Sequence, residues 1–232
     1  PAPPAPAPPA PTSGNGAPPE RDVPDIQYLD PDNWMRGSSK ADKITGTSRD
    51  DYLNGRSKAD TLRGLDGDDT YNVNVKNDRV IEAANGGTDR VVSYSREYDL
   101  AANVEHGRLN RKNAELNGNN LDNGLLGSTG NDRMDGRDGD DFLIGNRGRD
   151  TLTGGEGDDV FVYRALNEGG DFITDFTSGE DVIDLRDLNI SEANIEIKQS
   201  GGDAAVYVNN QLIALLDNVS ADQVSATNDF WL

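Results

Sequence analysis

The residues best suited to chemistry in this chain are aspartates that recur every nine residues. Beginning at Gly37 the sequence reads GSSKADKIT, GTSRDDYLN, GRSKADTLR and GLDGDDTYN; beginning at Gly118 it reads GNNLDNGLL, GSTGNDRMD, GRDGDDFLI, GNRGRDTLT and GGEGDDVFV. The first position is Gly in all nine units, and the sixth is Asp in eight units and Asn123 in the other. Aspartate in a glycine-rich turn is often only a turn former, but this register indicates a shared task for the carboxylates.

Carboxylates in stacked turns are suited to bind calcium, which takes about 6 to 8 oxygen ligands from carboxylates and backbone carbonyls. One loop cannot supply that many ligands, whereas two stacked loops can share an ion. The spacing predicts five ligand pairs: Asp132 with Asp150, Asp141 with Asp159, Asn123 with Asp141, Asp42 with Asp60, and Asp51 with Asp69. Turn carbonyls complete the predicted sites, and the glycines expected to take part are Gly127, Gly130, Gly136, Gly139, Gly145, Gly148, Gly154 and Gly157.

The eighth position of each unit indicates the element that presents the turn, because it is always apolar: Ile44, Leu53, Leu62, Tyr71, Leu125, Met134, Leu143, Leu152 and Phe161. A three-residue strand is not stable alone. We therefore expect successive units to form opposite faces of a flattened right-handed coil, with strands stacked about 4.8 Å apart. The predicted fold class is all-β, a right-handed parallel β-roll (β-solenoid) with 18 residues per turn. The first-position Gly is expected to adopt a backbone conformation that a Cβ disfavours.

The composition agrees with cation binding, since 42 acidic side chains against 22 basic ones leave a formal net charge of −20. Such a chain repels nucleic acid and anionic membranes at long range, and no apolar run is long enough for a membrane span. The chain has no cysteine, which excludes disulfides and thiolate zinc sites. Apolar residues make up only 34% of the chain, so we expect something besides apolar burial to help it fold.

Proline divides the chain, because all eleven prolines lie within the first 31 residues. Residues 1–20 are predicted to be a Pro/Ala-rich interdomain linker, which suggests the C-terminal piece of a larger protein; a disordered tail of a complete protein is the alternative. Residues 21–36 are expected to form a lead-in and residues 37–187 the roll, with arrays at 37–72 and 118–162. The segment 73–117 between them spans five nonapeptide periods but has Gly87, Arg96, Glu105 and Ala114 at the sixth position after Asp78. We expect it to continue the roll with irregular turns, and a small inserted sheet is the alternative.

The G-G-x-G-x-D-x-U-x pattern resembles the calcium-binding repeat of RTX (repeats-in-toxin), or hemolysin-type, proteins. The resemblance implies a C-terminal module of a type I secreted bacterial protein, as in serralysin-type C-terminal domains and alginate epimerase R-modules, with several Ca²⁺ ions. Residues 78–110 are similar to a segment that joins such arrays in polysaccharide-modifying enzymes. Residues 169–185 resemble the stretch after the last roll turn, where the acids corresponding to Asp175 and Asp181 help close the final calcium site.

The first array departs from the repeat, because Lys40, Arg49 and Lys58 occupy the fourth position, where the better units have Gly. A cation beside the carboxylates weakens calcium binding. These turns either use the basic side chain in place of an ion or bind calcium weakly.

Residues 188–232 lose the period and are expected to form a small antiparallel β cap, with turns at Gly201-Gly202 and Asn209-Asn210. The last residues, Asp229-Phe230-Trp231-Leu232, resemble the terminus of type I secretion substrates; packing on the cap is the simpler reading. The missing N-terminal signal and the absent cysteines fit that export route.

Three function classes are compatible with this sequence to different degrees. The first is a secreted, extracellular, non-catalytic module that folds on calcium, supports type I secretion and stabilises an upstream domain. Its expected partners are the type I secretion apparatus and that domain, and a monomer is expected. The alternative is binding of an anionic, alginate-like polysaccharide through a basic stripe of the first array: Lys40, Lys43, Arg49, Arg56, Lys58 and Arg63. An enzyme is disfavoured, because the sequence offers a single histidine, His106, and no nucleophile and base that belong together.

Overall fold

The structure is a computed structural model that describes residues 33–232. The predicted linker (1–20) and residues 21–32 of the predicted lead-in lie outside the described residues. No helix in the described part of the chain has the length and apolar character that crossing a membrane requires.

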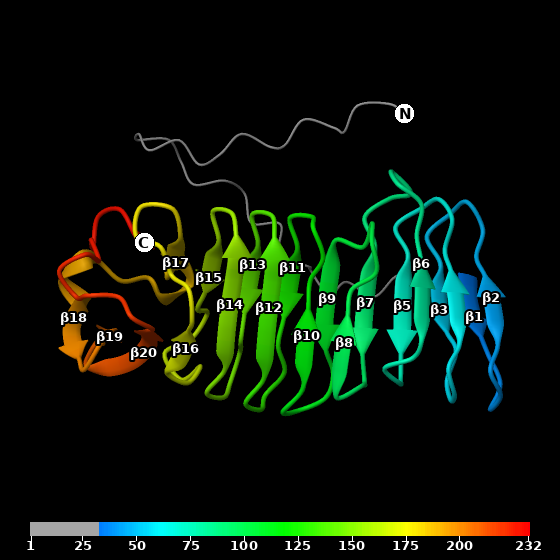
Figure 1. Cartoon of the computed structure of the whole chain (residues 1–232), viewed down its shortest axis with the longest axis horizontal. Helices are drawn as coiled ribbons and strands as arrows, with labels where there is room; N and C mark the ends of the chain where they lie inside the picture. Colours follow the sequence, from blue (N-terminus) through cyan, green and yellow to red (C-terminus); the bar gives the residue numbers. More distant parts are fainter. Residues whose placement is uncertain (1–32) are drawn as a thin grey trace.

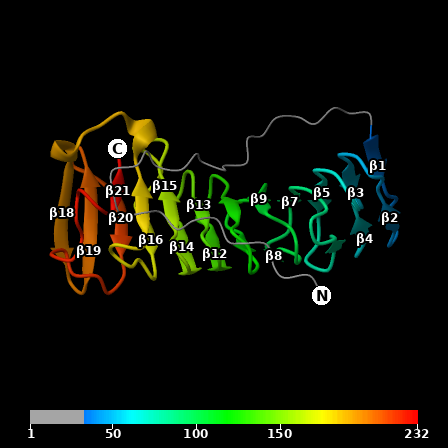
Figure 2. The same cartoon turned by 90° about the horizontal axis from the view of Figure 1, so that it is seen from above.

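The chain winds as a flattened solenoid whose strands alternate between two faces (Figures 1 and 2). The odd-numbered strands form one parallel ten-stranded sheet: β1 (Trp34–Arg36), β3 (Tyr52–Asn54), β5 (Thr70–Val73), β7 (Arg90–Ser93), β9 (His106–Leu109), β11 (Gly124–Leu126), β13 (Phe142–Ile144), β15 (Val160–Val162), β17 (Val182–Asp184) and β21 (Phe230–Trp231). The opposite face carries β2 (Lys43–Thr45), β4 (Thr61–Arg63) and β6 (Arg79–Ile81), then β8 (Glu97–Asp99), β10 (Glu115–Asn117), β12 (Arg133–Asp138), β14 (Thr151–Glu156) and β16 (Asp171–Ile173). The predicted all-β solenoid is confirmed.

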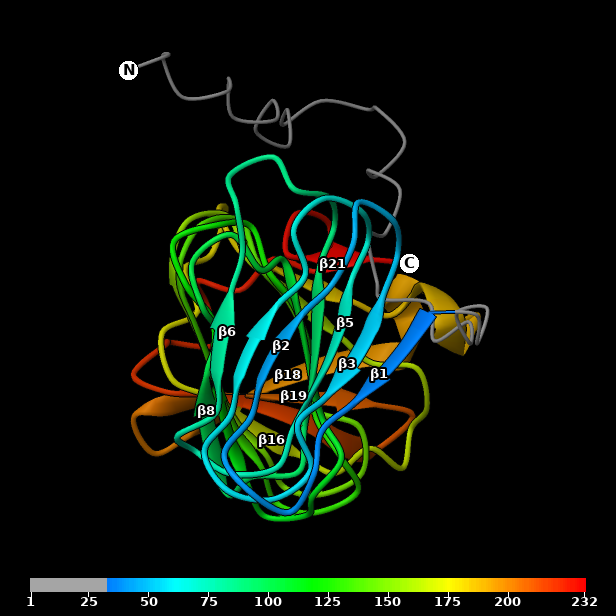
Figure 3. The ribbon, with the colours of Figure 1, turned by 90° about the vertical axis from the view of Figure 1, so that its right-hand side faces the viewer.

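The register places residues 18 apart beside each other, so the eighth-position side chains form a ladder inside the coil. Leu125 pairs with Leu143, and Leu143 pairs with Phe161. Eight of the nine eighth-position side chains are at most 1% exposed, and Ile44 at the open end is half-buried. Seen along its axis, the coil is a narrow oval (Figure 3). Each unit thus adds one fully buried side chain, worth about 1.5–3 kcal/mol, to a thin core.

The solenoid continues through the irregular middle segment on the odd-numbered face. Thr70 pairs with Arg90, twenty residues further on, and Arg90 pairs with His106, sixteen residues further on. The two irregular coils together restore the eighteen-residue register. On the other face the sheet is interrupted, because β6 and β8 are not paired with each other. The chain therefore forms no separate inserted sheet here, although one face of the roll is discontinuous.

The roll begins earlier than the repeat pattern indicates. Trp34 pairs with Tyr52 and Met35 with Leu53, so β1 belongs to the first coil although it lies in the predicted lead-in. The Trp34 and Tyr52 rings stack with their centroids 4.2 Å apart.

The C-terminal cap is an antiparallel meander of β18 (Ile195–Ser200), β19 (Asp203–Val208) and β20 (Gln211–Leu216), with turns at both predicted positions. Two short 3-10 helices, η2 (Arg186–Leu188) and η3 (Glu192–Asn194), lead into it. β20 adds to the edge of β16, and β21 adds Phe230 and Trp231 to the edge of β17. The last strands thus cover both open sheet edges at this end of the roll.

Candidate metal centre

The turns of the roll lie on two opposite edges that differ in charge. We name the turns that lead from even-numbered to odd-numbered strands the acidic edge, and the turns that lead from odd-numbered to even-numbered strands the basic edge; they are the upper and lower edges in Figure 1. The position before the sixth-position residue shows the difference: the acidic edge has Asp50, Asp68, Thr88, Val104, Asp122, Asp140, Asp158 and Glu180, and the basic edge has Ala41, Ala59, Asn77, Ser95, Asn113, Asn131, Arg149 and Gly170.

The sixth-position carboxylates form a ladder along each edge, interrupted by Arg96 and Ala114 on the basic edge and by the amide of Asn123 on the acidic edge. In each predicted pair, one oxygen of the later carboxylate accepts the backbone N–H of its partner in the preceding coil. The distances from N to Oδ1 are 2.7 Å for Asp132 and Asp150, 2.9 Å for Asp141 and Asp159, 2.6 Å for Asn123 and Asp141, 2.8 Å for Asp42 and Asp60, and 2.7 Å for Asp51 and Asp69. The structure therefore brings every predicted pair together, through a backbone donor.

The ladder contains carboxylates that the nonapeptide spacing misses. Asp69 N donates to Asp89 Oδ1, and Asp89 N donates to Glu105 Oε2, so the two-residue insertion places Asp89 where the spacing indicated Gly87. Asp150 N likewise donates to Asp171 Oδ1. Around the insertion, the strands β5, β7 and β9 are one residue longer than β6 and β8. This alternation in length is the only sequence signal that could have located Asp89.

Glycine at the first position has a steric role rather than the conformational one expected. No first-position glycine has φ in the left-handed region. A Cβ on Gly46 would lie 2.6 Å from Asp51 Oδ2 and 2.6 Å from the carbonyl oxygen of Gly64 in the next coil. The predicted ligand glycines pack equally closely, since a Cβ on Gly127 would lie 2.5 Å from the Gly145 carbonyl oxygen. Glycine is required because the carboxylate and the next turn occupy that space.

In one class of turn the second carboxylate oxygen accepts an N–H from within the same turn, and we call these the capped turns; Asp51, at the open end of its ladder, still has its Oδ1 buried without a partner. In the turn before β12, Asp132 Oδ2 accepts the Ser128 backbone N–H at 2.6 Å and the Ser128 hydroxyl at 2.7 Å. Asp132 Oδ1 accepts the Ala114 N–H at 2.9 Å. Second oxygens that accept an N–H from four residues earlier also occur at Asp42, Asp51, Asp78 and Asp181.

A second class leaves one carboxylate oxygen without a partner, and we call these the open turns. The residue after the first-position Gly is left-handed in each: Arg56 (φ 74°), Leu65 (φ 94°), Arg137 (φ 82°) and Asn146 (φ 65°). The second carboxylate oxygens of these turns, on Asp60, Asp69, Asp141 and Asp150, are buried without a hydrogen-bond partner. Non-Gly residues in this backbone region are strained by about 1–3 kcal/mol, which persists only where the surroundings dictate it.

Burial raises the pKa of these carboxyl groups, and neighbouring acids raise it further. Burial followed by the charge of Asp159 raises the pKa of Asp141 to about 9, although the Asn123 N–H opposes the shift. Burial also raises the pKa of Asp69, Asp89, Asp150 and Asp159 to about 7, that of Asp171 to about 8 and that of Asp181 to about 6. The folded chain thus holds its carboxylates in surroundings that disfavour their charge.

The open turns fit a hard divalent cation. Each offers a buried carboxylate oxygen that no protein donor satisfies, and an unsatisfied buried acceptor costs about 1–3 kcal/mol, more when charged. Oxygen-only ligands packed against glycine carbonyls are the donor set of calcium. At the end of the acidic edge, Asp175 accepts the N–H groups of Gly154 and Gly155 at 3.0 and 2.9 Å, and Asp181 accepts the Asp159 N–H at 2.9 Å. Both therefore lie beside the last predicted ligands.

The basic residues of the first array do not form one stripe. Lys40, Arg56 and Lys58 lie on the basic edge and Arg49 on the acidic edge, whereas Lys43 and Arg63 lie on the exposed face of the β2–β4–β6 sheet. Among residues 33–232, none of the fourth-position side chains of Lys40, Arg49 and Lys58 forms an ion pair with a carboxylate. The described contacts therefore give no support to the alternative in which these side chains replace an ion.

Comparison with known proteins places most of the chain in one family. Residues 53–230 match the family described as peptidase M10 serralysin C terminal. Among solved structures, the chain is similar to the solution structure of the AlgE6R3 subunit from the Azotobacter vinelandii mannuronan C5-epimerase, with 19% sequence identity and a TM-score of 0.33. That match covers 93% of this chain and 86% of the other. No curated protein matches the chain.

The two classes of turn predict different effects of matched substitutions. Asp141→Asn, in an open turn, should lower the number of calcium ions bound per chain, because it removes charge from a buried oxygen that lacks a protein partner. Asp132→Asn, in a capped turn, should destabilise the fold without lowering that number. Native mass spectrometry in calcium-containing ammonium acetate measures the stoichiometry, and equal losses of bound calcium in both variants would contradict the distinction.

The raised pKa values predict that the calcium-free protein is stabilised by acid. A carboxyl whose folded pKa exceeds its unfolded value contributes stability that is present below the unfolded pKa and lost as pH rises through the folded pKa. Circular dichroism of exhaustively dialysed protein should therefore show more β signal near pH 5 than near pH 8, with the loss spread across the folded pKa values of these carboxyls, from about 6 for Asp181 to about 9 for Asp141. A β signal that increases with pH across this range would contradict the burial argument.

Proposed function

The chain belongs to the family of peptidase M10 serralysin C-terminal domains, and from that premise we propose that it is a calcium-binding RTX module of a secreted protein. Domains of this family are C-terminal modules rather than the catalytic part of the proteins that contain them. The observation that supports calcium binding most directly is the set of buried, unpartnered carboxylate oxygens in the open turns.

The proposed mechanism begins with the chain's own charge. Without cations, 32 aspartates and 10 glutamates repel one another and the thin core cannot compensate, so the chain stays expanded. The ladder carboxylates of the open turns would hold calcium, which would neutralise their charge and link adjacent coils. The ladder residues then orient the turns through their N–H to Oδ1 bonds, and the eighth-position side chains close the core. An expanded chain suits passage through a type I exporter, and calcium outside the cell supplies the ion for folding.

The C-terminal cap has a defined place in this proposal. β20 and β21 extend the two sheets, and Asp229, which is fully buried, accepts the Ser225 and Gly179 N–H groups at 2.8 and 3.0 Å. Arg186 lies over the Trp231 ring at 4.7 Å from its centroid. A C-terminal segment that the exporter recognises in the expanded chain can thus become part of the folded module. There it protects the end of the roll and the upstream domain.

A second candidate function, binding of an anionic polysaccharide, is favoured by the basic edge. Ten basic side chains of its turns are exposed, whereas six of its seven acids are buried and Asp42 is half-buried. A hollow of about 540 Å³ on this edge is lined by Arg108, Lys112, Arg147 and Arg164, with Glu168 as an acidic neighbour. The exposed basic side chains are Lys40, Arg56, Lys58, Lys76, Arg96, Arg111, Lys112, Arg147, Arg149 and Arg164.

The secretion proposal predicts that export and folding can be separated. A reporter fused ahead of the chain should reach the medium of a Gram-negative host with a type I exporter, and removal of residues 188–232 should abolish this. Asp141→Asn should leave export intact, because the exporter takes the expanded chain, but should leave the exported module more sensitive to added protease. Export of a chain that lacks residues 188–232 would contradict the proposed role in secretion.

The polysaccharide proposal predicts salt-sensitive binding through the basic edge. Charge reversal at Arg147 and Arg164 together should weaken alginate binding by about tenfold or more at low salt, because these side chains line one hollow. Reversal of Lys43 and Arg63, which changes the net charge equally on the sheet face, is the matched control. Equal weakening by both pairs of substitutions would show that only net charge matters.

A further inference from the structure

The turn of the acidic edge between β6 and β7 differs from the repeats in length and in its first residue. It runs from residue 82 to residue 89 between β6 and β7, two residues longer than the turn of a nonapeptide unit. Glu82 follows the strand directly, at the position that Gly occupies in all nine units. With the sixth-position acid displaced to Asp89, the space beside the preceding coil can accept a side chain.

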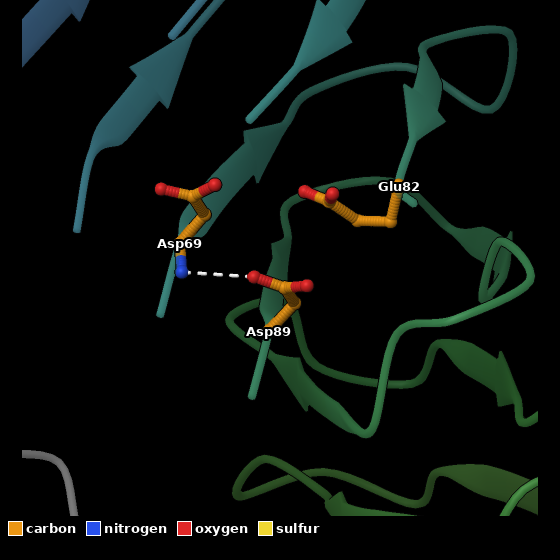
Figure 4. A group of neighbouring side chains, drawn as sticks. All are labelled: Asp69, Glu82 and Asp89. Carbon is orange, nitrogen blue, oxygen red and sulfur yellow. Dashed lines mark hydrogen bonds between the residues drawn. The ribbon is translucent and has the colours of Figure 1, made fainter. Parts of the chain in front are cut away.

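Three carboxylates from separate segments meet at this turn (Figure 4). One oxygen from each of Asp69, Glu82 and Asp89 lies within 4.8 Å of the other two. Asp69 N donates to Asp89 Oδ1 at 2.9 Å, which holds the two ladder members in register. Glu82 is half-buried, whereas Asp69 and Asp89 are each 1% exposed.

The cluster contains buried oxygen atoms that no protein group satisfies. Asp69 Oδ2 and Glu82 Oε1 are buried without hydrogen-bond partners, as is the hydroxyl of Tyr71, whose side chain is fully buried. A Cβ on Gly64 would collide with both Asp69 Oδ2 and the Tyr71 hydroxyl, so these two oxygens lie beside the same glycine. Asp69 belongs to an open turn, in which Leu65 is left-handed with φ 94°.

Neighbouring acids act on each member of this cluster: Asp51 on Asp69, Asp69 on Glu82, and Glu105 on Asp89. The ion pairs described within residues 33–232 involve acids outside the cluster: Glu97, Glu115, Asp99, Asp184 and Glu196. Burial, followed by the charge of Asp89, raises the pKa of Glu82 to about 8. Three acids held together in this way need a ligand of opposite charge when they are ionised.

We propose that Asp69, Glu82 and Asp89 form a divalent-cation site, selective for a calcium-sized ion, in which the open turn of Asp69 is completed by two acids from outside the regular repeats. An ion with ligands at about 2.3–2.6 Å joins oxygens up to about 5 Å apart, which matches the spacing of the cluster. The site rests on the proposed calcium function but takes a ligand from a turn outside both arrays. It ties the first array to the coils whose register shifts by two residues, next to the gap between β6 and β8.

The test compares Glu82→Gln with Asp66→Asn in the full chain. Both substitutions remove one negative charge from the acidic edge, but Asp66 is exposed and lies outside the cluster. Calcium stoichiometry is measured by native mass spectrometry, after circular dichroism shows that each variant is folded at saturating calcium. We expect Glu82→Gln to bind one calcium ion fewer than the parent and Asp66→Asn to bind the same number.

Terbium provides a second readout through Tyr71, because a bound lanthanide beside a tyrosine is excited through the ring. Tyr71→Phe should lower the terbium emission in the parent and have no effect in the Glu82→Gln background. If Glu82→Gln does not fold, Glu82→Asp replaces it. The shorter carboxylate should keep the number of bound calcium ions and lower the affinity for one of them.

The outcomes separate the site from the wider function. Several bound ions in the parent and an unchanged number and affinity in both Glu82 variants would overturn the Glu82 site and leave the repeat sites standing. A parent chain that binds no calcium would overturn both the proposed function and this site.

Discussion

The structure depends on ladders of buried carboxylates stacked with the period of the coil. From Asp60 onward, each ladder acid accepts the backbone N–H of the preceding coil with one oxygen, which sets the distance and register between coils. In the open turns the other oxygen is buried without a partner, as in Asp141 and Asp150. The same side chains therefore order the turns and, when ionised, destabilise the fold through buried charge that no protein group neutralises. Because each unit buries only a single apolar side chain inside the coil, a bound cation is the natural way to offset this destabilisation.

The two edges of the roll differ in the charge of the side chains beside their ladders. The acidic edge places Asp140 beside Asp141 and Asp158 beside Asp159, and the two doublets are linked because Asp158 N donates to Asp140 Oδ1 at 2.9 Å. On the basic edge the corresponding ladder is made of amides, with Asn131 N donating to Asn113 Oδ1 at 2.9 Å. One backbone geometry thus accommodates a carboxylate on one edge and a neutral amide on the other, which leaves the basic edge free for an anionic partner.

Much of this architecture could be predicted from the sequence because the repeated pattern of residue types specifies it. Glycine at position one, an acid at position six and an apolar residue at position eight predict the strands, the coil and the paired turns. The irregular coils could not be predicted in the same way, since Asp89 and Glu82 are found only once the insertion after Ile81 is placed in the sheet. The difference between Ser128, which caps Asp132, and Arg137, which leaves Asp141 open, depends on a backbone φ that spacing does not reveal. The reason for the first-position glycine also required coordinates, because it lies in the next coil.

The most direct test of the account is a calcium titration of the chelated protein followed by far-ultraviolet circular dichroism, with magnesium as the control. Magnesium is smaller and demands octahedral geometry, so it should not replace calcium in these turns. The account predicts a cooperative gain of β signal at about 10⁻⁴ to 10⁻³ M calcium, the range of extracellular calcium modules, and little gain with magnesium. A full β signal in chelator at neutral pH, unchanged by added calcium, would contradict it, because the ladders would then be stable without their counter-ion.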